Sequence, residues 1–143
     1  MGLRPECTVE TFNARGQGYF PAYVGVQVVE VAEGLVRAQF TVAPHHLAPN
    51  GFLHAASVVA LADTSAGYAC LAHLPPGAES FTTLELKANF VSSVREGVVV
   101  CEARAVHLGR TTQLWEARVT AQAMGRLMAT FACTQLVLMP REA

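Results

Sequence analysis

The sequence has little charge, and none of it is concentrated. Charged residues make up 15% of the 143 residues, and the formal net charge is -1 at pH 7. A nucleic-acid-binding surface needs a basic stripe, or a cluster of Lys and Arg among aromatic residues, and neither occurs. We therefore expect no nucleic acid among the partners of this protein.

Segments that would direct the chain to a membrane are also missing. The first residues contain no apolar stretch typical of a signal peptide, and Glu6 stands where a myristoylation signal requires Ser or Thr. No apolar run reaches the ~18 residues that cross a bilayer, because Ser57 and residues 63–65 interrupt the best candidate. These absences predict a soluble, cytoplasmic protein that does not act at a membrane.

Close pairs of metal ligands are absent as well. The four cysteines are far apart in the chain, and an intracellular protein is not expected to contain disulfides. His45 and His46 are adjacent, so in an extended segment their side chains point to opposite sides, and no carboxylate or cysteine follows at ligand spacing. We expect no metal site, and reduced core residues at Cys70, Cys101 and Cys133.

Apolar side chains, in contrast, are abundant and make up 52% of all residues. A chain of this length and composition forms one globular domain with a larger core than average. We therefore expect a single domain over residues 1–143, in which residues 1–22 form a short helix and a turn that lead into it. The apolar excess also favours association, because part of it can cover a subunit interface.

Runs of β-branched and aromatic residues predict six strands. Val24–Val31 and Leu35–Val42 are joined by three residues ending in glycine, which indicates a hairpin. Two prolines and a glycine then make residues 44–51 a loop. The other four strands follow a helical segment and are expected to form a meander: Ser80–Phe90, Val98–His107, Thr111–Ala121 and Arg126–Leu138.

The helical segment between the hairpin and these four strands is rich in small residues. It begins at His54 and runs to about Ala72, and residues 75–77, Pro-Pro-Gly, end it as a helix stop would. So many alanines let other backbone approach closely, which favours a helix wrapped by a sheet. The order predicts an α+β protein in which a curled antiparallel sheet wraps one central helix, and it resembles the hotdog fold.

Asp63 is a solitary acid in the middle of this helix. The residues three and four positions away on either side carry no charge that could neutralise it: Val59, Ala60, Ala66 and Gly67. Burying an unpaired carboxylate costs several kcal/mol or raises its pKa. The sequence therefore favours a functional acid that faces a cleft.

The residues around the helix start resemble the signature of hotdog thioesterases of the phenylacetate-degradation (PaaI-like) type. Residues 49–56 read Pro-Asn-Gly-Phe-Leu-His-Ala-Ala, which matches the family's loop Gly and its His-Gly-Gly, and Asp63 matches the family's helical Asp. The resemblance covers the whole order of elements. It implies an acyl-CoA thioesterase of phenylacetic acid degradation, a dimer often doubled into a homotetramer. It also implies no cofactor, since coenzyme A is part of the substrate.

The chain departs from that signature at two places. Ala55 and Ala56 replace glycines, which preserves the backbone amide that the first position supplies. Ala48 stands where the family has an oxyanion-binding Asn, so Asn50 is the nearby side chain that could replace this donor. Asn50 and Gly51 are also compatible with a plain turn.

A helix that starts near His54 leaves its first amides unpaired, so the Ala55 N–H can stabilise the oxyanion of a thioester. Asp63 lies further along the same helix by ~12 Å, at ~1.5 Å per residue. One carbonyl cannot contact both groups of a single helix. A site that uses both predicts a dimer with two equivalent sites across its interface. Asp63 would act there as general base on water or as nucleophile forming a mixed anhydride.

Four further residues are candidates for the site. Thr83 matches a family position whose hydroxyl helps hold the acid or the water; a strand threonine without such a role is the alternative. His54 is either a capping side chain or a substrate contact. Arg110, with Thr111 beside it, matches a basic residue for the coenzyme A phosphates, or is a solvated turn arginine.

Three functions are therefore compared. The favoured one is a thioesterase for an aryl-acetyl, hydroxybenzoyl or medium-chain acyl-CoA, because apolar helix and sheet residues would line its pocket. An acyl-thioester dehydratase or hydratase would need a catalytic His in a His-Phe-Pro-Gly-like loop, which residues 44–47 match poorly. A non-catalytic acyl-CoA-binding protein would use Asp63 as a structural polar residue.

Overall fold

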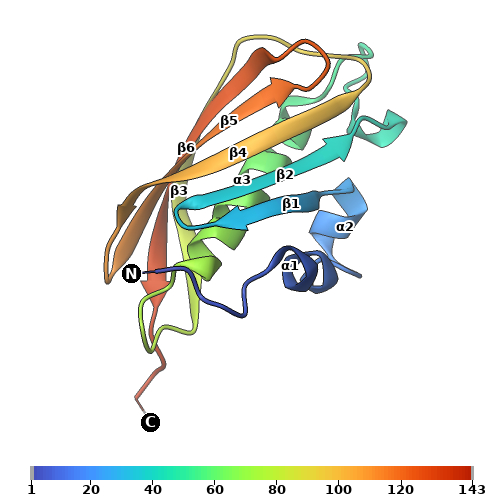
Figure 1. The fold of residues 1–143 in the computed structure, drawn as a ribbon. Coiled ribbons are helices and arrows are strands. Elements are labelled where there is room, and N and C mark those ends of the chain that lie inside the picture. The colour runs from blue at the N-terminus through green and yellow to red at the C-terminus, as the bar shows by residue number, and fades with distance from the viewer. Residues whose placement is uncertain (1, 143) are drawn as a thin grey trace.

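The computed structural model describes residues 2–142 and shows one long helix inside a curled six-stranded sheet (Figure 1). The helices are α1 (Val9–Arg15), α2 (Phe20–Val24) and α3 (Ala55–Ala72), and a 3₁₀ turn spans Pro44–His46. The strands are β1 (Gln27–Ala32), β2 (Leu35–Thr41), β3 (Ser80–Phe90), β4 (Val98–Leu108), β5 (Thr112–Ala121) and β6 (Arg126–Leu138). The predicted α+β hotdog architecture is confirmed; the ends of the predicted domain, Met1 and Ala143, lie outside the described residues.

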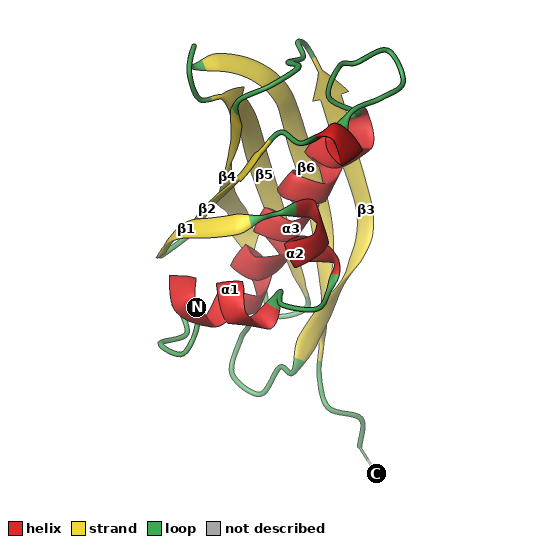
Figure 2. Ribbon diagram, turned by 90° about the vertical axis from the view of Figure 1, so that its right-hand side faces the viewer, coloured by secondary structure: helices red, strands yellow, loops and turns green. Residues whose placement is uncertain are grey.

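The sheet is antiparallel, with the strand order β1-β2-β4-β5-β6-β3. The predicted meander is correct for β4, β5 and β6 but wrong for β3, which pairs with β6 and not with β4. Figure 2 shows how this arises: α3 crosses one face of the sheet and delivers the chain to the far edge. A strand usually neighbours the next strand in sequence, but a helical crossover can separate the two. As a result, β1 and β3 are the two edge strands.

Small side chains let the sheet close around α3. Ala62, Ala66 and Ala69 are fully buried, and a methyl group added at Gly67 would lie only 3.0 Å from the ring of Phe81. The helix is long and apolar enough to pass a test for membrane spans. However, 56% of it is buried inside the fold, and core helices pass the same test.

The N-terminal segment contains one helix more than the sequence predicted. Helix α1 begins after a capping box at Thr8, and α2 ends at Gly25, whose φ of +84° suits a glycine. The strand predicted from Val24 therefore begins only at Gln27. Asn13 fixes α1 against β1, because its side-chain amide both accepts from the Val28 N–H at 2.8 Å and donates to the Val28 carbonyl at 3.0 Å.

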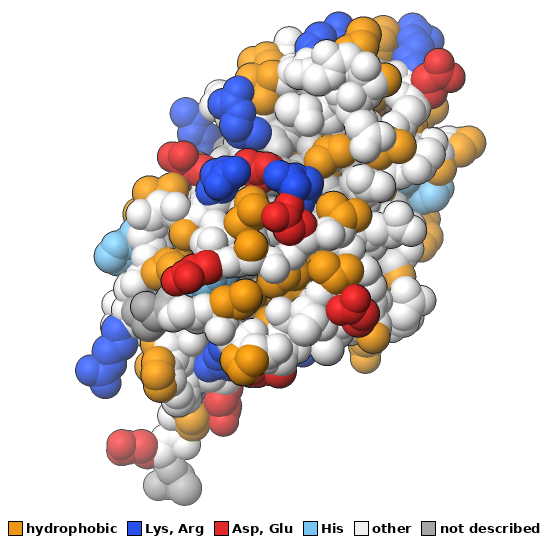
Figure 3. Space-filling model, in the orientation of Figure 1, with side chains coloured by type: hydrophobic (Ala, Val, Ile, Leu, Met, Phe, Trp, Pro, Cys, Tyr) orange, Lys and Arg blue, Asp and Glu red, His pale blue; other side chains and the backbone are white. Residues whose placement is uncertain are grey.

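The outer face of the sheet is polar. Along β5 the side chains of Trp115, Ala117 and Val119 are buried, whereas Glu116 and Arg118 between them are exposed. Positive and negative side chains lie next to one another in the middle of this face (Figure 3). They include an ion-pair network on the neighbouring strands, made by Glu30, Arg37, Glu102 and Arg104.

Three of the four cysteines have the predicted core role. Cys70, Cys101 and Cys133 are buried and free, and burial raises the pKa of each thiol to about 12. Their thiols therefore stay protonated at neutral pH and act as small apolar groups.

Candidate active site

The N-terminus of α3 presents one unpaired amide. His54 is the N-cap, and its Nδ1 atom accepts a hydrogen bond from the Ala56 N–H at 2.9 Å. The next two amides, of Ser57 and Val58, donate to the His54 carbonyl. The Ala55 N–H has no acceptor among residues 2–142, and Ala55 is exposed. This amide is therefore an open donor at the positive end of the helix, where it can polarise a carbonyl oxygen.

The loop before α3 is ordered by its own hydrogen bonds. The Ala48 N–H donates to the Phe52 carbonyl at 2.7 Å, and the Asn50 Oδ1 atom accepts from the Phe52 N–H at 3.1 Å. Gly51 has a φ of +84°, which other residues rarely adopt, so this turn requires glycine. The Asn50 Nδ2 group has no acceptor within the described part of the chain, and it stays available to a ligand.

Asp63, the sole aspartate of the sequence, is half-buried in the middle of α3. Its Oδ1 atom is buried and has no hydrogen-bond partner in residues 2–142. Loss of solvent raises the pKa of the Asp63 carboxyl above its ordinary value of 3.8. A carboxylate that has lost water without gaining a partner is a stronger base than one in solution, as a general base requires.

An apolar cavity of about 250 Å³ lies beside Asp63. Its walls come from α3, from β3 and from the N-terminal segment, and they include Gly67, Tyr68, Phe81, Pro21 and Arg15. Two aromatic rings and a glycine make a wall that accommodates a flat apolar group. The cavity can therefore hold an acyl group whose carbonyl carbon lies at the carboxylate.

The open Ala55 amide and the Asp63 carboxylate lie on the same helix but too far apart to contact one substrate atom. Ala55 and Asp63 are separated by ~12 Å along α3. Within one subunit, no single thioester carbonyl reaches both groups. Within the described chain, the Ala55 amide therefore has no acid beside it, and the Asp63 carboxylate has no open amide beside it.

Thr83 is a half-buried residue of β3, and a chain of hydrogen bonds connects it with Cys133. Its hydroxyl donates to the Gln135 Oε1 atom at 2.9 Å, and the Gln135 Nε2 group donates to the Cys133 sulfur at 3.4 Å. The Asp63 carboxylate contributes to the raised pKa of Cys133, so this polar chain ends close to the acid. The Thr83 proton is directed to Gln135, and the predicted role of Thr83 at the site stays a prediction.

Arg110 and Thr111 are exposed in the turn between β4 and β5. This turn lies near the C-terminal end of α3, because the Gln113 Nε2 group donates to the carbonyl of His73, the C-cap of that helix, at 2.8 Å. His54 lies at the other end, ~27 Å away by the length of the helix. A single subunit therefore does not bring Arg110 to the open amide.

The adjacent histidines have structural contacts. His46 is buried, its Nδ1 atom accepts from the Ala43 N–H at 2.9 Å, and its Nε2 atom lies 2.6 Å from the Val24 carbonyl. Burial lowers the pKa of His46, so the ring is neutral. Residues 2–142 contain no group of three His, Cys, Asp or Glu side chains placed to hold a metal ion.

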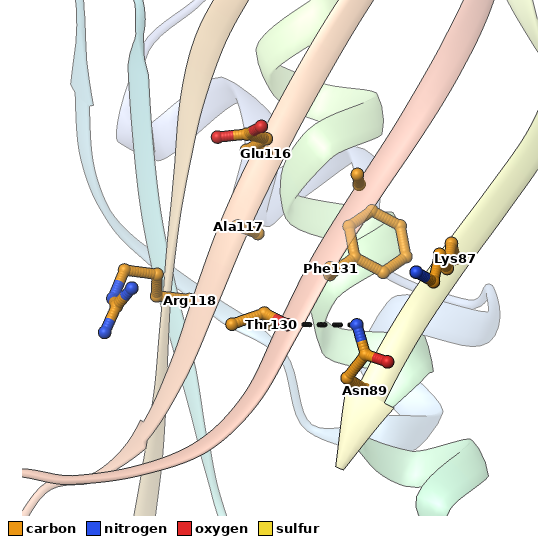
Figure 4. Close-up of a pocket in the computed structure, with 8 residues that line it drawn as sticks. Lys87, Asn89, Glu116, Ala117, Arg118, Thr130 and Phe131 are labelled. Atoms are coloured by element: carbon orange, nitrogen blue, oxygen red, sulfur yellow. Dashed lines mark hydrogen bonds between the residues drawn. The ribbon is translucent and has the colours of Figure 1, made fainter. Parts of the chain in front are cut away.

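A second depression, on the outer face of the sheet, lacks these features. It has a volume of about 350 Å³ and is shown in Figure 4. The side chains of Lys87, Asn89, Glu116 and Arg118 surround it, with Asn89 donating to Thr130 at 3.5 Å. These are exposed or half-exposed positions on three strands, and the depression contains no unpaired buried acid. We therefore place the candidate site at Asp63.

Comparison with known proteins shows the family of this chain. The model of the family described as the thioesterase superfamily matches residues 50–127, which include Asn50, Ala55, Asp63 and the strands β3, β4 and β5. The chain belongs to the thioesterase superfamily. It is 31% identical over 119 residues to 1,4-dihydroxy-2-naphthoyl-CoA hydrolase of Listeria monocytogenes, covering 83% of this chain and 95% of the relative. It is 30% identical to the enzyme of the same name from Escherichia coli, covering 96% of this chain and 100% of the relative.

Solved structures of this thioesterase superfamily share the whole fold. A thioesterase from Haemophilus influenzae superposes with a TM-score of 0.91 at 26% identity, covering 99% of this chain and 98% of the other. The PaaI protein of Escherichia coli superposes with a TM-score of 0.79 at 19% identity, which supports the shared fold alone. Thioester hydrolysis is thus the activity of the family, while the PaaI-like subtype has only weak support.

Of the residues that line this cavity, the sequence of this thioesterase-superfamily chain pointed to Asp63 alone; Tyr68 and Arg15 are among those it did not reveal. Tyr68 follows Asp63 by five residues, which at 3.6 residues per turn directs the two side chains about 140° apart around α3, so helical spacing did not predict that both line one cavity. Arg15 comes from α1, far away in the chain, and no local pattern connects it with Asp63. Only the packing of α1 on α3 shows that it lines the cavity.

Because ionised Asp63 is desolvated and unpaired, we expect Asp63→Asn to stabilise the protein at neutral pH. The folded state raises the pKa of this acid, so its contribution to stability is greatest below the unfolded value and falls as pH rises through the folded value. The gain from the substitution should be present at pH 7 and vanish below the ordinary aspartate pKa of 3.8. Thermal unfolding of both proteins at several pH values measures it, and a pH-independent difference in Tm would contradict it.

Proposed function

We propose that this protein is an acyl-CoA thioesterase that acts in the cytoplasm on an aryl-acetyl, hydroxybenzoyl or medium-chain acyl-CoA. The observation that carries the proposal is the half-buried carboxylate of Asp63 beside an apolar cavity, with an Oδ1 atom that is buried and has no hydrogen-bond partner in residues 2–142. Family membership supports thioester hydrolysis, and two relatives are named for the hydrolysis of a dihydroxynaphthoyl thioester. Among the proposed acyl groups, those names favour the aromatic ones.

In the proposed reaction, the Ala55 N–H of one subunit binds the thioester oxygen, and Asp63 of a second subunit acts on the carbonyl carbon. As a general base, Asp63 takes a proton from water while the water oxygen attacks, and the tetrahedral intermediate then expels coenzyme A as a thiolate. As a nucleophile, Asp63 instead attacks the carbonyl carbon, the C–S bond breaks and coenzyme A leaves as a thiolate, and water then hydrolyses the resulting mixed anhydride to the free acid and the Asp63 carboxylate. The raised pKa of Asp63 suits the first route, whereas both use the same residues.

A second copy of the chain is the partner that this site requires, and β3 offers an edge for it. This strand pairs only with β6, and its other edge is free in the described chain. Leu84, Leu86, Phe90 and the following Val91 are exposed there, with 55%, 41%, 47% and 62% of their surface accessible. A long apolar edge strand is normally covered. We therefore propose a homodimer joined along β3, with a tetramer as its doubled form.

The direct test is the release of coenzyme A from a panel of thioesters: benzoyl, 4-hydroxybenzoyl, phenylacetyl and octanoyl. The expected result is steady release that is fastest with an aromatic acyl group. Retained binding without release from any of the four would overturn the proposal and favour a non-catalytic acyl-CoA-binding protein. Release from octanoyl-CoA alone would show that the protein is specific for straight-chain and not for aromatic acyl groups.

Asn50 is the proposed side-chain donor in place of the family's Asn, and Asn50→Asp tests it. The aspartate keeps the Oδ1 acceptor that the Phe52 N–H uses, so the turn persists, but it removes the Nδ2 donor. We expect kcat to fall by about 10²-fold with little change in Tm. An unchanged kcat would show that Asn50 serves the turn alone.

A further inference from the structure

The cavity beside Asp63 extends past the acid to the guanidinium-bearing side chain of Arg15. Arg15, Pro21 and Tyr68 line both this cavity and an adjoining one of about 450 Å³. Tyr68 lies beyond Asp63 by ~7.5 Å along α3, at ~1.5 Å per residue. That length accommodates one aromatic ring and a substituent on its far side. The ring of Phe81, close against Gly67, forms the wall between the two ends.

The packing of α1 on α3 places the backbone of Arg15 beside Tyr68, while the Arg15 side chain is exposed. Phe12, one turn earlier in α1, stacks on Tyr68 with ring centroids 4.6 Å apart and an interplanar angle of 11°. A methyl group added at Gly16 would lie 3.3 Å from the Tyr68 hydroxyl oxygen, so the chain passes directly over this hydroxyl. Burial raises the pKa of Tyr68 and the Arg15 charge opposes the rise, as expected for a guanidinium near the hydroxyl.

Neither Arg15 nor the Tyr68 hydroxyl has a polar partner in the part of the chain that the structure describes. The ion pairs of residues 2–142 use Arg37 and Arg104, and the side-chain hydrogen bonds include neither Arg15 nor Tyr68. An arginine in the last turn of α1 also interacts favourably with the helix dipole. The dipole accounts for the residue type but not for its place in the wall of the acyl cavity.

This end of the cavity therefore presents a guanidinium and a phenolic O–H, which together match an oxygen acceptor. Building on the proposed function, we propose that Arg15 and Tyr68 select an aromatic acyl-CoA whose ring carries a hydroxyl or carboxylate opposite the thioester. The carbonyl carbon then lies at Asp63, the ring lies against Phe81, and the ring substituent accepts from Arg15. Both residues determine specificity, and neither contacts the reacting atoms.

Binding in the Asp63→Asn background tests this proposal without interference from hydrolysis. The dissociation constants of benzoyl-CoA and 4-hydroxybenzoyl-CoA are measured by calorimetry. We expect the hydroxylated ligand to bind about tenfold more tightly, because a charge-assisted hydrogen bond is gained. Arg15→Met, which keeps the apolar stem, should abolish this preference and leave the affinity for benzoyl-CoA unchanged. Tyr68→Phe, which keeps the stacking on Phe12, should remove part of it.

Arg118→Met is the matched control, since Arg118 is an exposed arginine on the outer face of β5; the preference should survive this substitution. Equal affinities in the Asp63→Asn protein, or an Arg15→Met variant that weakens both ligands alike with a lowered Tm, would overturn the proposal. If 4-hydroxybenzoyl-CoA binds more tightly than benzoyl-CoA but the unmodified protein hydrolyses neither, the specificity role of Arg15 and Tyr68 is supported and the thioesterase function is refuted. If the protein hydrolyses the thioesters but binds both ligands equally, the thioesterase function is supported and the specificity role is refuted.

Discussion

Replacing Asp63 by asparagine is expected to lower kcat about 10³-fold while acyl-CoA binding is retained. The substitution preserves the shape of the side chain but removes the group that, in the proposed mechanism, accepts a proton from water or attacks the thioester, and such groups contribute about 10²- to 10⁴-fold. The same acid should set the pH dependence: kcat/KM rises with pH through the pKa of Asp63, which burial raises above its ordinary value. Rates of coenzyme A release and calorimetric affinities measure both effects.

Glu116→Gln provides the control for charge. Glu116 is an exposed carboxylate on the outer face of β5, and its removal changes the net charge by the same amount. This variant should hydrolyse thioesters at the rate of the unmodified protein. If Asp63→Asn also retained its rate, the acid would be a structural residue, and the role of the carboxylate in the proposed mechanism would have to be abandoned.

Replacing Ala55 by proline is expected to lower kcat about 10²- to 10³-fold through the loss of a single hydrogen-bond donor. Proline is well tolerated at the first position of a helix, because its missing N–H would be unpaired there anyway. His54 has φ -68° and ψ 138°, a conformation that a following proline favours. The Ala55 N–H makes no hydrogen bond to residues 2–142, so Tm should barely change. Ala56→Pro, which also removes the bond to His54, is a destabilising comparison.

The two inactive variants together test the shared site. A heterodimer of one Asp63→Asn subunit and one Ala55→Pro subunit has one site with both groups intact and one site with neither. Co-expressed with different affinity tags and purified as a heterodimer, it should recover about half of the unmodified activity; a random mixture should recover about a quarter. A heterodimer as inactive as its parents would show that the acid and the amide do not act on one thioester.

Local chemistry made several features predictable. Asp63 was identifiable because no neighbour on its helical face carries a charge, and its Oδ1 atom has no hydrogen-bond partner among residues 2–142. The start of α3 was predictable within one residue because a capping histidine precedes a run of good helix formers. The strands Ser80–Phe90 and Arg126–Leu138 have the predicted bounds, since clear turn signals flank both.

Other features could not be predicted because they depend on contacts between distant segments. Helix α2 consists of five residues, Phe20–Val24, and it is too short for a helical period to appear in the sequence. Its last residue, Val24, has high strand propensity, and tertiary packing overrides that preference. The position of β3 next to β6 follows from the crossover of α3, which no strand pattern encodes.

The sequence by itself determined the small-residue central helix, the family, the solitary acid and the open first amide, because each depends on neighbours within a few positions. The tertiary structure decided that β3 is an edge, that the Asp63 Oδ1 atom is buried without a partner in the described chain, and that Arg15 lines the cavity beside Asp63. Burial and strand order arise when segments distant in the chain pack together. For that reason the proposed reacting groups were visible in the sequence, whereas the residues that we propose select the substrate were not.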